Sequence, residues 1–279
     1  GIPYHAPRYD ADVVGTPYTM EVLKILMEDA GQRIKNPIVS IPVNGTYLSK
    51  GNSSYKVEFI NITHSTLQCA IIALHTPSGV ILYANDYKLD NTPVFGDKPN
   101  YARLKELAHK GVKALIVDCL YAPDDRKTPS EKIAKSLLED VFFSTPHQNA
   151  GMVITTFSSH IARLKTITEF GKRLNREVIF VGRSLIKYCL AAQRIGKAPF
   201  LSGVKMCTYR KQVEKMLSIV NKNKNRYLVV CTGHQGEPGS ILDRLAKQQL
   251  PLHLGSEDQI IFSSKTIPTP ENIAQRTEL

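Results

Sequence analysis

Apolar residues follow two alternating patterns along most of the chain. Apolar positions three and four residues apart predict helices over 20–34, 101–109, 131–143, 160–174, 185–195, 209–221 and 241–249. Short apolar runs lie between these helices and predict parallel strands buried on both faces, at 113–118, 151–156, 177–181, 226–231 and 259–262. Strands that alternate with helices in this way indicate an α/β protein.

The first third of the chain has a different pattern. Its strands follow one another with almost no helix between them, at 38–41, 55–63, 69–75 and 80–84. The sequence Thr76-Pro-Ser-Gly79 is typical of a turn that joins the last two strands as a hairpin. We therefore expect two domains, with a boundary near residue 116.

Composition excludes several classes of protein. With 42% hydrophobic and 22% charged residues among 279, the chain is neither disordered nor a collagen or coiled coil. No apolar run reaches the roughly 18 residues that a membrane helix needs, so we expect a soluble protein without membrane contact. No C-x-x-C pair occurs, which favours the reducing cytoplasm. The five cysteines are scattered over Cys69, Cys119, Cys189, Cys207 and Cys231.

The net charge indicates a polyanionic partner. Thirty-six Lys and Arg against 25 Asp and Glu give +11 at pH 7, and the pI is near 9.4. A basic cluster within 205–226 holds a single acidic residue, Glu214. It comprises Lys205, Arg210, Lys211, Lys215, Lys222, Lys224 and Arg226. A nucleic acid backbone would bind there with release of counterions, although a solvated helix face is the alternative explanation.

Polar residues follow each predicted parallel strand, where ligands of such sheets bind. Hydroxyl groups at helix N-termini leave backbone N–H groups available to phosphate, but the same residues also serve as ordinary N-caps. Taken together with the net charge, these strand ends favour phosphate binding. The candidates are Asp118, then Ser158, Ser159 and His160, then Arg183 and Ser184, then His234, Gln235 and Glu237.

Two further candidates end strands of the first third. His64 follows the strand at 55–63, and Asp86 follows the strand at 80–84. An imidazole and a carboxylate suit a zinc or manganese site. A histidine at a strand end is also commonly a plain surface residue, so spacing alone leaves both explanations open.

Several separated segments resemble one family. His64-Ser65, 76–90 and 115–119 resemble motifs of metallo-β-lactamase-fold nucleases. Thr155–His160, Gly182–Ser184 and Cys231–Pro238 resemble the ribonuclease J branch in its archaeal form. The resemblance extends over essentially all 279 residues.

The resemblance implies a fold and its domains. We expect residues 1–116 to form part of a metallo-β-lactamase αββα sandwich that lacks its N-terminal metal motif. An inserted β-CASP α/β domain, a parallel sheet flanked by helices, is expected over 117–265. Residues 266–279 would return toward the first domain.

The resemblance also implies a metal-dependent ribonuclease that cuts RNA phosphodiesters from a 5′ end, internally or both, in RNA processing and decay. Two zinc ions would be held with the help of His64, which binds one, and Asp86, which bridges both. Asp118 would orient a ligand or a bound water. Single-stranded RNA, with a 5′-monophosphate, would be the substrate, and a homodimer is implied. An RNA channel between the domains would be lined by Ser158, Ser159, His160, Arg183, Ser184, His234, Gln235 and Glu237.

One departure from the family changes the expectation. The family's H-x-H-x-D-H motif is absent, since no H-x-H occurs among the eight histidines. In the family, this motif lies just upstream of the segment that resembles Gly1-Ile2-Pro3, with which the chain starts. We therefore expect the middle part of a larger nuclease, truncated at both ends, that binds metal weakly and does not cut RNA alone. The alternatives are a non-catalytic RNA-binding module that grips phosphates and a DNA-directed relative.

Overall fold

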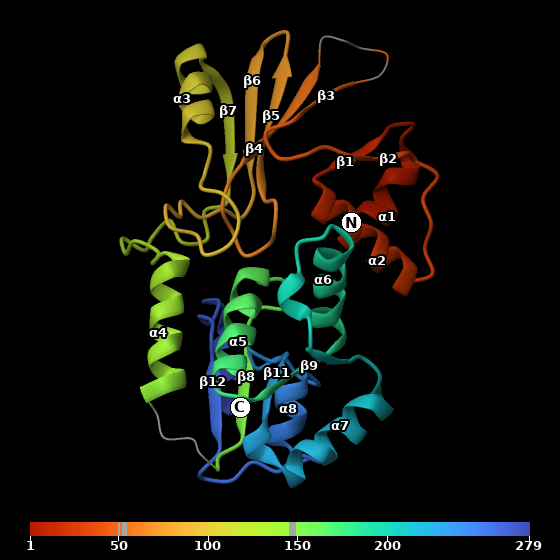
Figure 1. Ribbon diagram of the computed structural model, residues 1–279. Coiled ribbons are helices and arrows are strands. Elements are labelled where there is room, and N and C mark those ends of the chain that lie inside the picture. Colours follow the sequence, from red (N-terminus) through yellow and green to blue (C-terminus); the bar gives the residue numbers. More distant parts are fainter. Residues whose placement is uncertain (50, 52–54, 145–148) are drawn as a thin grey trace. The chain divides into compact units, whose positions relative to one another are not determined.

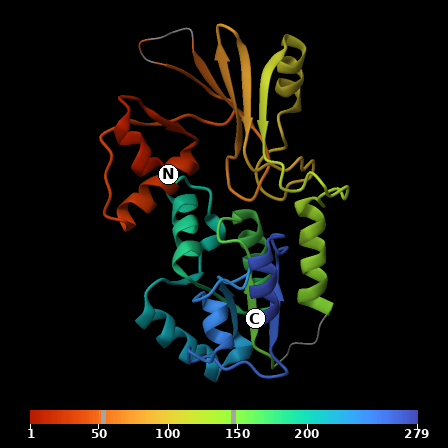
Figure 2. The same ribbon diagram turned by 180° about the vertical axis from the view of Figure 1, so that it is seen from behind.

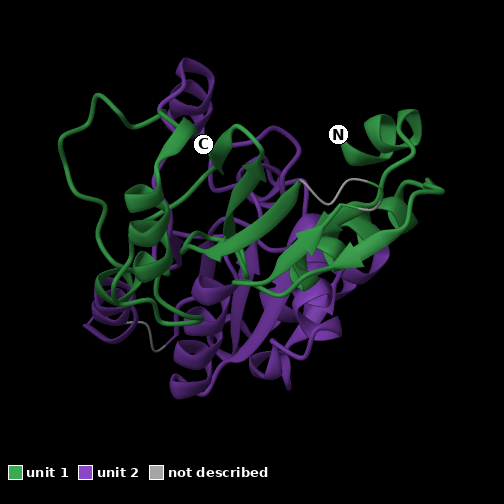
Figure 3. Ribbon diagram, turned by 90° about the horizontal axis from the view of Figure 1, so that it is seen from above, with its two compact units in different colours: residues 1–134 green, residues 135–279 purple. Residues whose placement is uncertain are grey.

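The computed structural model describes residues 1–49, 51, 55–144 and 149–279. The chain divides into two compact units, Gly1–Ala134 and Lys135–Leu279, which Figure 3 colours separately. The boundary predicted near residue 116 falls at the end of strand β7 (Val112–Val117), and helix α4 (Glu131–Ser144) spans the division between the units.

The first unit is built on a sheet whose strand order is β3-β4-β5-β6-β7 among the described residues (Figure 1). Neighbours are antiparallel except β6 and β7, which are parallel and connected through α3 (Tyr101–Lys110). The predicted hairpin is confirmed, with Thr76 paired to Gly79. The other strands are β3 (Thr46–Leu48), β4 (Lys56–Asn61), β5 (Ala70–Thr76) and β6 (Gly79–Ala84).

Alternate residues of these strands face a small apolar core. Ile60, Ala73 and Leu82 are buried there together with Leu107 of α3. A second cluster lies nearer the N-terminus, where β1 pairs in parallel with β2 and the apolar face of α2 packs on them. These elements are α1 (Ile2–His5), η1 (Ala6–Arg8), β1 (Val13–Gly15), α2 (Pro17–Asp29) and β2 (Ile38–Ser40).

The prediction of burial for the strand at 113–118 is wrong. The strand forms, as β7, but Leu115 and Ile116 are 61% and 52% exposed. In the described part of the chain β7 lies at the edge of the first unit's sheet beside β6, and of its residues Val112 packs against the apolar cluster of that sheet. An apolar run therefore indicated a strand correctly without indicating which of its faces are covered.

A buried carboxylate of the first sheet is held by two basic side chains. Glu58 on β4 accepts hydrogen bonds from Arg103 Nε and Nη2 at 2.6 and 2.9 Å, and His75 Nε2 lies 2.9 Å from it. The Arg103 hydrogen bond is the largest influence and lowers the pKa of Glu58, against the opposing effect of burial. The ionised form of Glu58 is thus favoured in the folded state.

This arrangement predicts an acid-sensitive first unit. Because folding lowers the pKa of Glu58, its contribution is complete above the unfolded pKa and is lost as the pH falls through the folded one. We expect Glu58→Gln to cost about 1–3 kcal/mol at pH 7 and to flatten the loss of stability below about pH 4. Urea unfolding at several pH values measures both. Glu106→Gln is the matched control, because Glu106 binds the same Arg103 from an exposed position; an equal effect of the two variants would contradict the prediction.

The second unit contains a parallel sheet with the order β10-β9-β11-β8-β12 among the described residues (Figures 1 and 2). Four of its strands were predicted as parallel strands, and they are confirmed. The short strand β10 was not predicted, because three residues are too few to show a pattern. The strands are β8 (Met152–Thr155), β9 (Glu177–Val181), β10 (Lys205–Cys207), β11 (Tyr227–Cys231) and β12 (Gln259–Phe262).

Helices cover both faces of this sheet. Val229 and Cys231 are buried in one apolar cluster with residues of α7 and α8. On α5, a Cβ added to Gly171 would lie 2.8 Å from Leu228, whose side chain faces the opposite way from that of Val229. The helices are α5 (Ile161–Arg173), α6 (Arg183–Arg194), α7 (Arg210–Lys222), α8 (Ile241–Ala246) and α9 (Pro270–Glu278); η2 (Pro199–Leu201) and η3 (Lys224–Arg226) are short.

The strand order creates a switch point at the carboxyl ends of the strands. From β8 the chain moves to β9 and β10 in one direction, and then returns to β11 and β12. Strand β11 therefore lies between β9 and β8. With right-handed crossovers, the helices that follow β8 and β9 cover one face of the sheet, and the helix that follows β11 covers the opposite face. Ligands of open α/β sheets bind at such a point, so the loop after β11 occupies the place where a ligand is expected.

Candidate functional site

Three predicted residues lie at one edge of the first sheet. Strands β4 and β6 are both antiparallel to β5, so their carboxyl ends lie at the same edge, and β7 shares it because it is parallel to β6. His64, Asp86 and Asp118 follow these three strands. The sheet topology thus brings together residues separated by up to 54 positions in sequence.

Backbone contacts hold this edge together. Thr63 forms an isolated bridge with Lys88, whose N–H donates to Thr63 O at 2.7 Å. Cys69 Sγ lies 3.8 Å from Asp86 O, and the N–H of Asp118 donates to Ala84 O at 3.1 Å. The segments that carry His64 and Asp86 are therefore neighbours, with that of Asp118 beside them.

The side chains at this edge do not form a complete metal centre. His64 Nδ1 lies 3.2 Å from Ser65 Oγ, and Asp118 Oδ1 accepts from the N–H of Leu120. Among the described residues, no three His, Cys, Asp or Glu side chains are grouped so that they could hold a metal ion. Tight zinc binding takes three or four protein ligands. The residues present do not fit two zinc ions by themselves, and the metal roles of His64 and Asp86 stay predictions.

A second group of predicted residues gathers where strands of the second unit end. Ser158 Oγ and Ser184 Oγ are 3.2 Å apart, which joins the ends of β8 and β9. The rings of Phe157 and His234 meet edge to face with 4.0 Å between centroids, which joins β8 to β11. We call this group the strand-end rim: Phe157, Ser158, Ser159, His160, Arg183, Ser184, His234, Gln235 and Glu237.

Two helices begin at the rim in different ways. His160 caps α5, since its Nδ1 accepts from the N–H of Arg163 at 3.3 Å. Gly182 precedes α6 and offers no side-chain cap, and its φ of 127° suits glycine. A Cβ there would also lie 2.9 Å from Thr232. Arg183 and Ser184 are exposed in the first turn of α6, where the helix dipole favours an anion.

Side-chain hydrogen bonds hold the loop after β11 in position. Gln235 is 4% exposed, and its amide donates to Lys265 O at 2.9 Å and accepts from the N–H of Ile267 at 2.8 Å. Arg276 Nη1 donates to His234 O at 2.6 Å. Gln235 therefore uses its side chain to position the segment that follows β12. Sequence reasoning missed Phe157 and Arg276. Phenylalanine is seldom a site residue, and the contact of Arg276 with His234 joins residues 42 positions apart, so it depends on the tertiary fold.

Burial favours the neutral form of the His234 imidazole. Burial is the main influence and lowers the pKa of His234, while the Glu237 carboxylate, 3.6 Å from its Nδ1, acts in the opposite direction. Nε2 of His234 is buried and has no hydrogen-bond partner among the described residues. A neutral imidazole at the switch point adds no positive charge to the rim, whereas the exposed Arg183 guanidinium does.

Comparison with known proteins relates the chain to one family. Residues 149–277 match the family model described as the ribonuclease J β-CASP domain. Ribonuclease J of Pyrococcus abyssi is 41% identical over 278 residues, 98% of this chain and 60% of that protein. Nearly the whole chain is thus similar to ribonuclease J, and its second unit is similar to the β-CASP domain of that family. Ribonuclease J of Methanocaldococcus jannaschii is 37% identical over 277 residues, 99% of this chain and 61% of that protein.

The chain spans about 60% of the length of the curated relatives it matches. A crystal structure of a protein of unknown function from Enterococcus faecalis has the same fold, with a TM-score of 0.55. It is 12% identical, and the likeness covers 91% of this chain and 64% of that one. The α/β fold with a parallel β-CASP sheet is thereby confirmed.

The basic cluster at 205–226 is partly neutralised by carboxylates. Glu177 lies within 2.5 Å of Lys205 and 3.7 Å of Arg226, and Lys224 pairs with Asp258 at 2.6 Å. Arg210 pairs with Glu214 at 2.7 Å. The exposed residues Lys211, Lys215 and Lys222 of α7 have no ion-pair partner in the described part of the chain. The positive surface is therefore narrower than the sequence indicated.

No helix in the described part of the chain has the length and apolar character needed to cross a membrane.

Proposed function

We propose that the protein hydrolyses RNA phosphodiester bonds with the help of bound metal ions, in RNA processing and decay. The observation that carries this proposal is the meeting of His64, Asp86 and Asp118 at one edge of the first sheet in a chain similar to ribonuclease J. An imidazole beside carboxylates is the donor set that hydrolytic metal sites use. Both 5′-to-3′ exonuclease and endonuclease action agree with these residues.

The finer parts of the proposal concern the metal. Zinc suits the imidazole of His64 and the carboxylate of Asp86 better than a hard cation does. His64 would bind one ion, Asp86 would bridge two, and Asp118 would orient a ligand. The described residues supply too few ligands for two ions, so the proposal requires further ligands at this edge.

The strand-end rim and the basic residues of α7 would hold the substrate. Hydroxyl groups and helix N-termini bind phosphate without reading bases, which suits single-stranded RNA. A 5′-monophosphate, with its second negative charge, would bind the exposed rim residue Arg183 in a bidentate manner. We further propose a homodimer in the cytoplasm.

The test is an RNA degradation assay with and without a chelator. The assay uses two samples, the 279-residue chain and the product of the complete reading frame that contains it. We expect degradation of 5′-monophosphorylated RNA by the complete product, its loss with the chelator, and its recovery with zinc. The 279-residue chain by itself is expected to show no robust cleavage. Chelator-resistant cleavage, or no cleavage by the complete product, would refute the proposal.

A second candidate function is an RNA-binding module that grips phosphates without cutting. The lack of a three-residue metal cluster among the described residues favours it. It requires salt-dependent RNA affinity in a metal-free sample, and it excludes chelator-sensitive cleavage by the complete product. Matched RNA and DNA strands in the same binding assay address a DNA-directed activity.

A further inference from the structure

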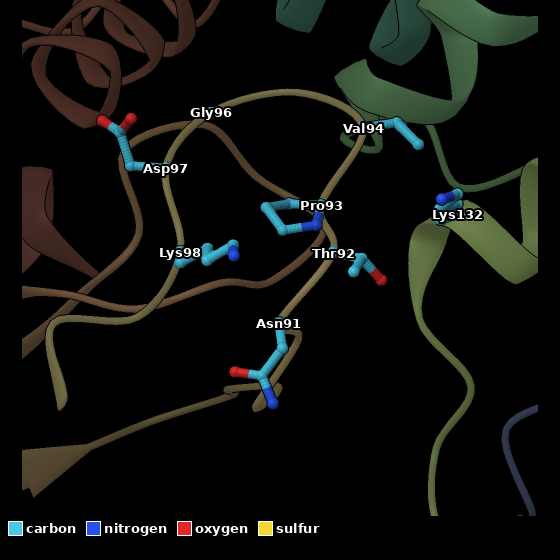
Figure 4. A pocket seen from close by; sticks show the side chains of 8 residues that line it. All are labelled: Asn91, Thr92, Pro93, Val94, Gly96, Asp97, Lys98 and Lys132. Atoms are coloured by element: carbon cyan, nitrogen blue, oxygen red, sulfur yellow. The ribbon is translucent and has the colours of Figure 1, made fainter.

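A pocket of the first unit lies at the loop that follows the edge carrying His64 and Asp86. It has a volume of about 470 Å³ and is lined by residues 91–94 and 96–98 and by Lys132 in the first turn of α4 (Figure 4). Ligand pockets of proteins commonly measure about 300–1,000 Å³. The size is therefore sufficient for a nucleotide or a segment of nucleic acid backbone.

Buried side chains hold both ends of the pocket loop. Asp90, which is 3% exposed, accepts hydrogen bonds from the N–H groups of Thr92 and Glu131 at 2.9 and 2.7 Å. Asn61 Nδ2 donates to Lys98 O at 2.7 Å. The loop is thereby tied to the first turn of α4 at one end and to strand β4 at the other. A loop fixed in this way presents its groups at little cost in conformational entropy.

The charges of the pocket favour an anion. Lys98 and Lys132 are exposed and have no ion-pair partner among the described residues. Asp97 is the carboxylate of the lining, and Figure 4 shows its carboxyl group pointing away from the Lys98 side chain, which points toward Pro93. Most basic residues of the 205–226 cluster are paired with carboxylates, whereas these two lysines are not.

The neutral groups of the pocket suit a nucleotide. The Asn91 amide and the Thr92 hydroxyl supply hydrogen-bond donors beside the two ammonium groups, and Pro93 and Val94 supply apolar surface. Ammonium groups bind phosphate as point charges, and apolar side chains pack against a sugar or base. The pocket thus combines the features that a phosphate with its attached nucleoside requires.

We propose that this pocket binds a phosphate group of RNA through Lys98 and Lys132. The inference rests on the proposed function and adds a specific phosphate subsite to it, made of other residues than the strand-end rim and than His64 and Asp86. The phosphate comes either from the backbone or from a 5′ end, and the experiment separates these two sources.

The experiment compares Lys98→Gln/Lys132→Gln with Lys105→Gln/Lys110→Gln, a control pair of exposed lysines on α3. Fluorescence anisotropy measures binding of a short single-stranded RNA to the 279-residue chain, without metal and at several salt concentrations. We expect the pocket variant to bind about tenfold more weakly, and its slope of log affinity against log salt to fall by about 0.7, since the contact with one phosphate is lost. The control pair is expected to change neither quantity by as much.

The RNA is supplied with a 5′-hydroxyl or a 5′-monophosphate. Equal losses for both RNAs identify a backbone phosphate, and a loss confined to the monophosphate identifies the 5′ end. Unchanged binding of both RNAs by the pocket variant, with wild-type binding intact, overturns the subsite and leaves the proposed function standing. Failure of the wild-type chain to bind RNA overturns the subsite as well. Chelator-sensitive cleavage then decides the proposed function separately.

Discussion

Replacement of Asp86 by Asn is expected to reduce RNA hydrolysis by about a thousandfold or more in the complete gene product. Asp86 follows β6 at the edge shared with His64 and Asp118, and a bridging carboxylate there would neutralise two cations. The amide of Asn keeps the shape and loses the charge. A thousandfold loss corresponds to about 4 kcal/mol of transition-state stabilisation.

The measurement pairs initial rates with metal content. Asp10→Asn is the control, because Asp10 is an exposed aspartate of the first unit outside this edge. We expect Asp86→Asn to lose bound zinc together with activity, while its circular dichroism spectrum is unchanged. Full activity in the Asp86→Asn variant would remove Asp86 from the proposed metal site, whatever the fate of the family assignment.

The second large effect concerns the stability of the β-CASP unit. Arg176 is 5% exposed and precedes β9. Its guanidinium donates to Ala150 O at 2.9 Å, to Tyr227 O at 3.0 Å and to Lys224 O at 3.2 Å. It thereby ties together the chain before β8 and the start of β11. Burial lowers the pKa of this guanidinium, a sign of the desolvation that these carbonyl groups offset.

Arg176→Met is therefore expected to lower the free energy of unfolding by about 3–5 kcal/mol, because two buried carbonyl groups and one part-buried carbonyl group lose their donor. Urea unfolding followed by circular dichroism measures the loss, since the chain has no Trp. Arg210→Met is the control: Arg210 is exposed and pairs with Glu214, and its replacement is expected to leave the free energy of unfolding nearly unchanged. Equal midpoints for the two variants would show that the carbonyl contacts of Arg176 contribute little.

The sequence predicted the regular part of the fold well, for a physical reason. Strands β8, β9 and β11 are buried on both faces, so they appear as continuous apolar runs, and their helices show a 3.6-residue period. The short strands β1, β3 and β10 were not predicted, because three residues contain too little pattern. The exposure of β7 could not be predicted, since local sequence does not state which strand lies at an edge.

The features of the candidate site likewise divide into those that the sequence predicted and those that depend on the tertiary structure. Ser158 and Ser184, 26 positions apart, were named from their place after strands, and the sheet does bring them within 3.2 Å. The burial of Gln235 and its clamp on Lys265 and Ile267 were not foreseen, because they depend on partners 30 and 32 residues away. The ion pairs that the basic cluster forms with Glu177 and Asp258 could not be predicted either, because these two carboxylates lie outside the cluster in sequence.

The sequence by itself determined the class of fold, the family resemblance and which residues are candidates for binding metal or phosphate, because periodicity and motifs are local properties of the chain. Only the tertiary structure decided which of these residues meet. It placed Asp118 beside Ala84, set the loop after β11 at the switch point, and left Lys98 and Lys132 without carboxylate partners among the described residues. Charge pairing and burial depend on residues distant in sequence, and sheet topology determines which of those residues become neighbours.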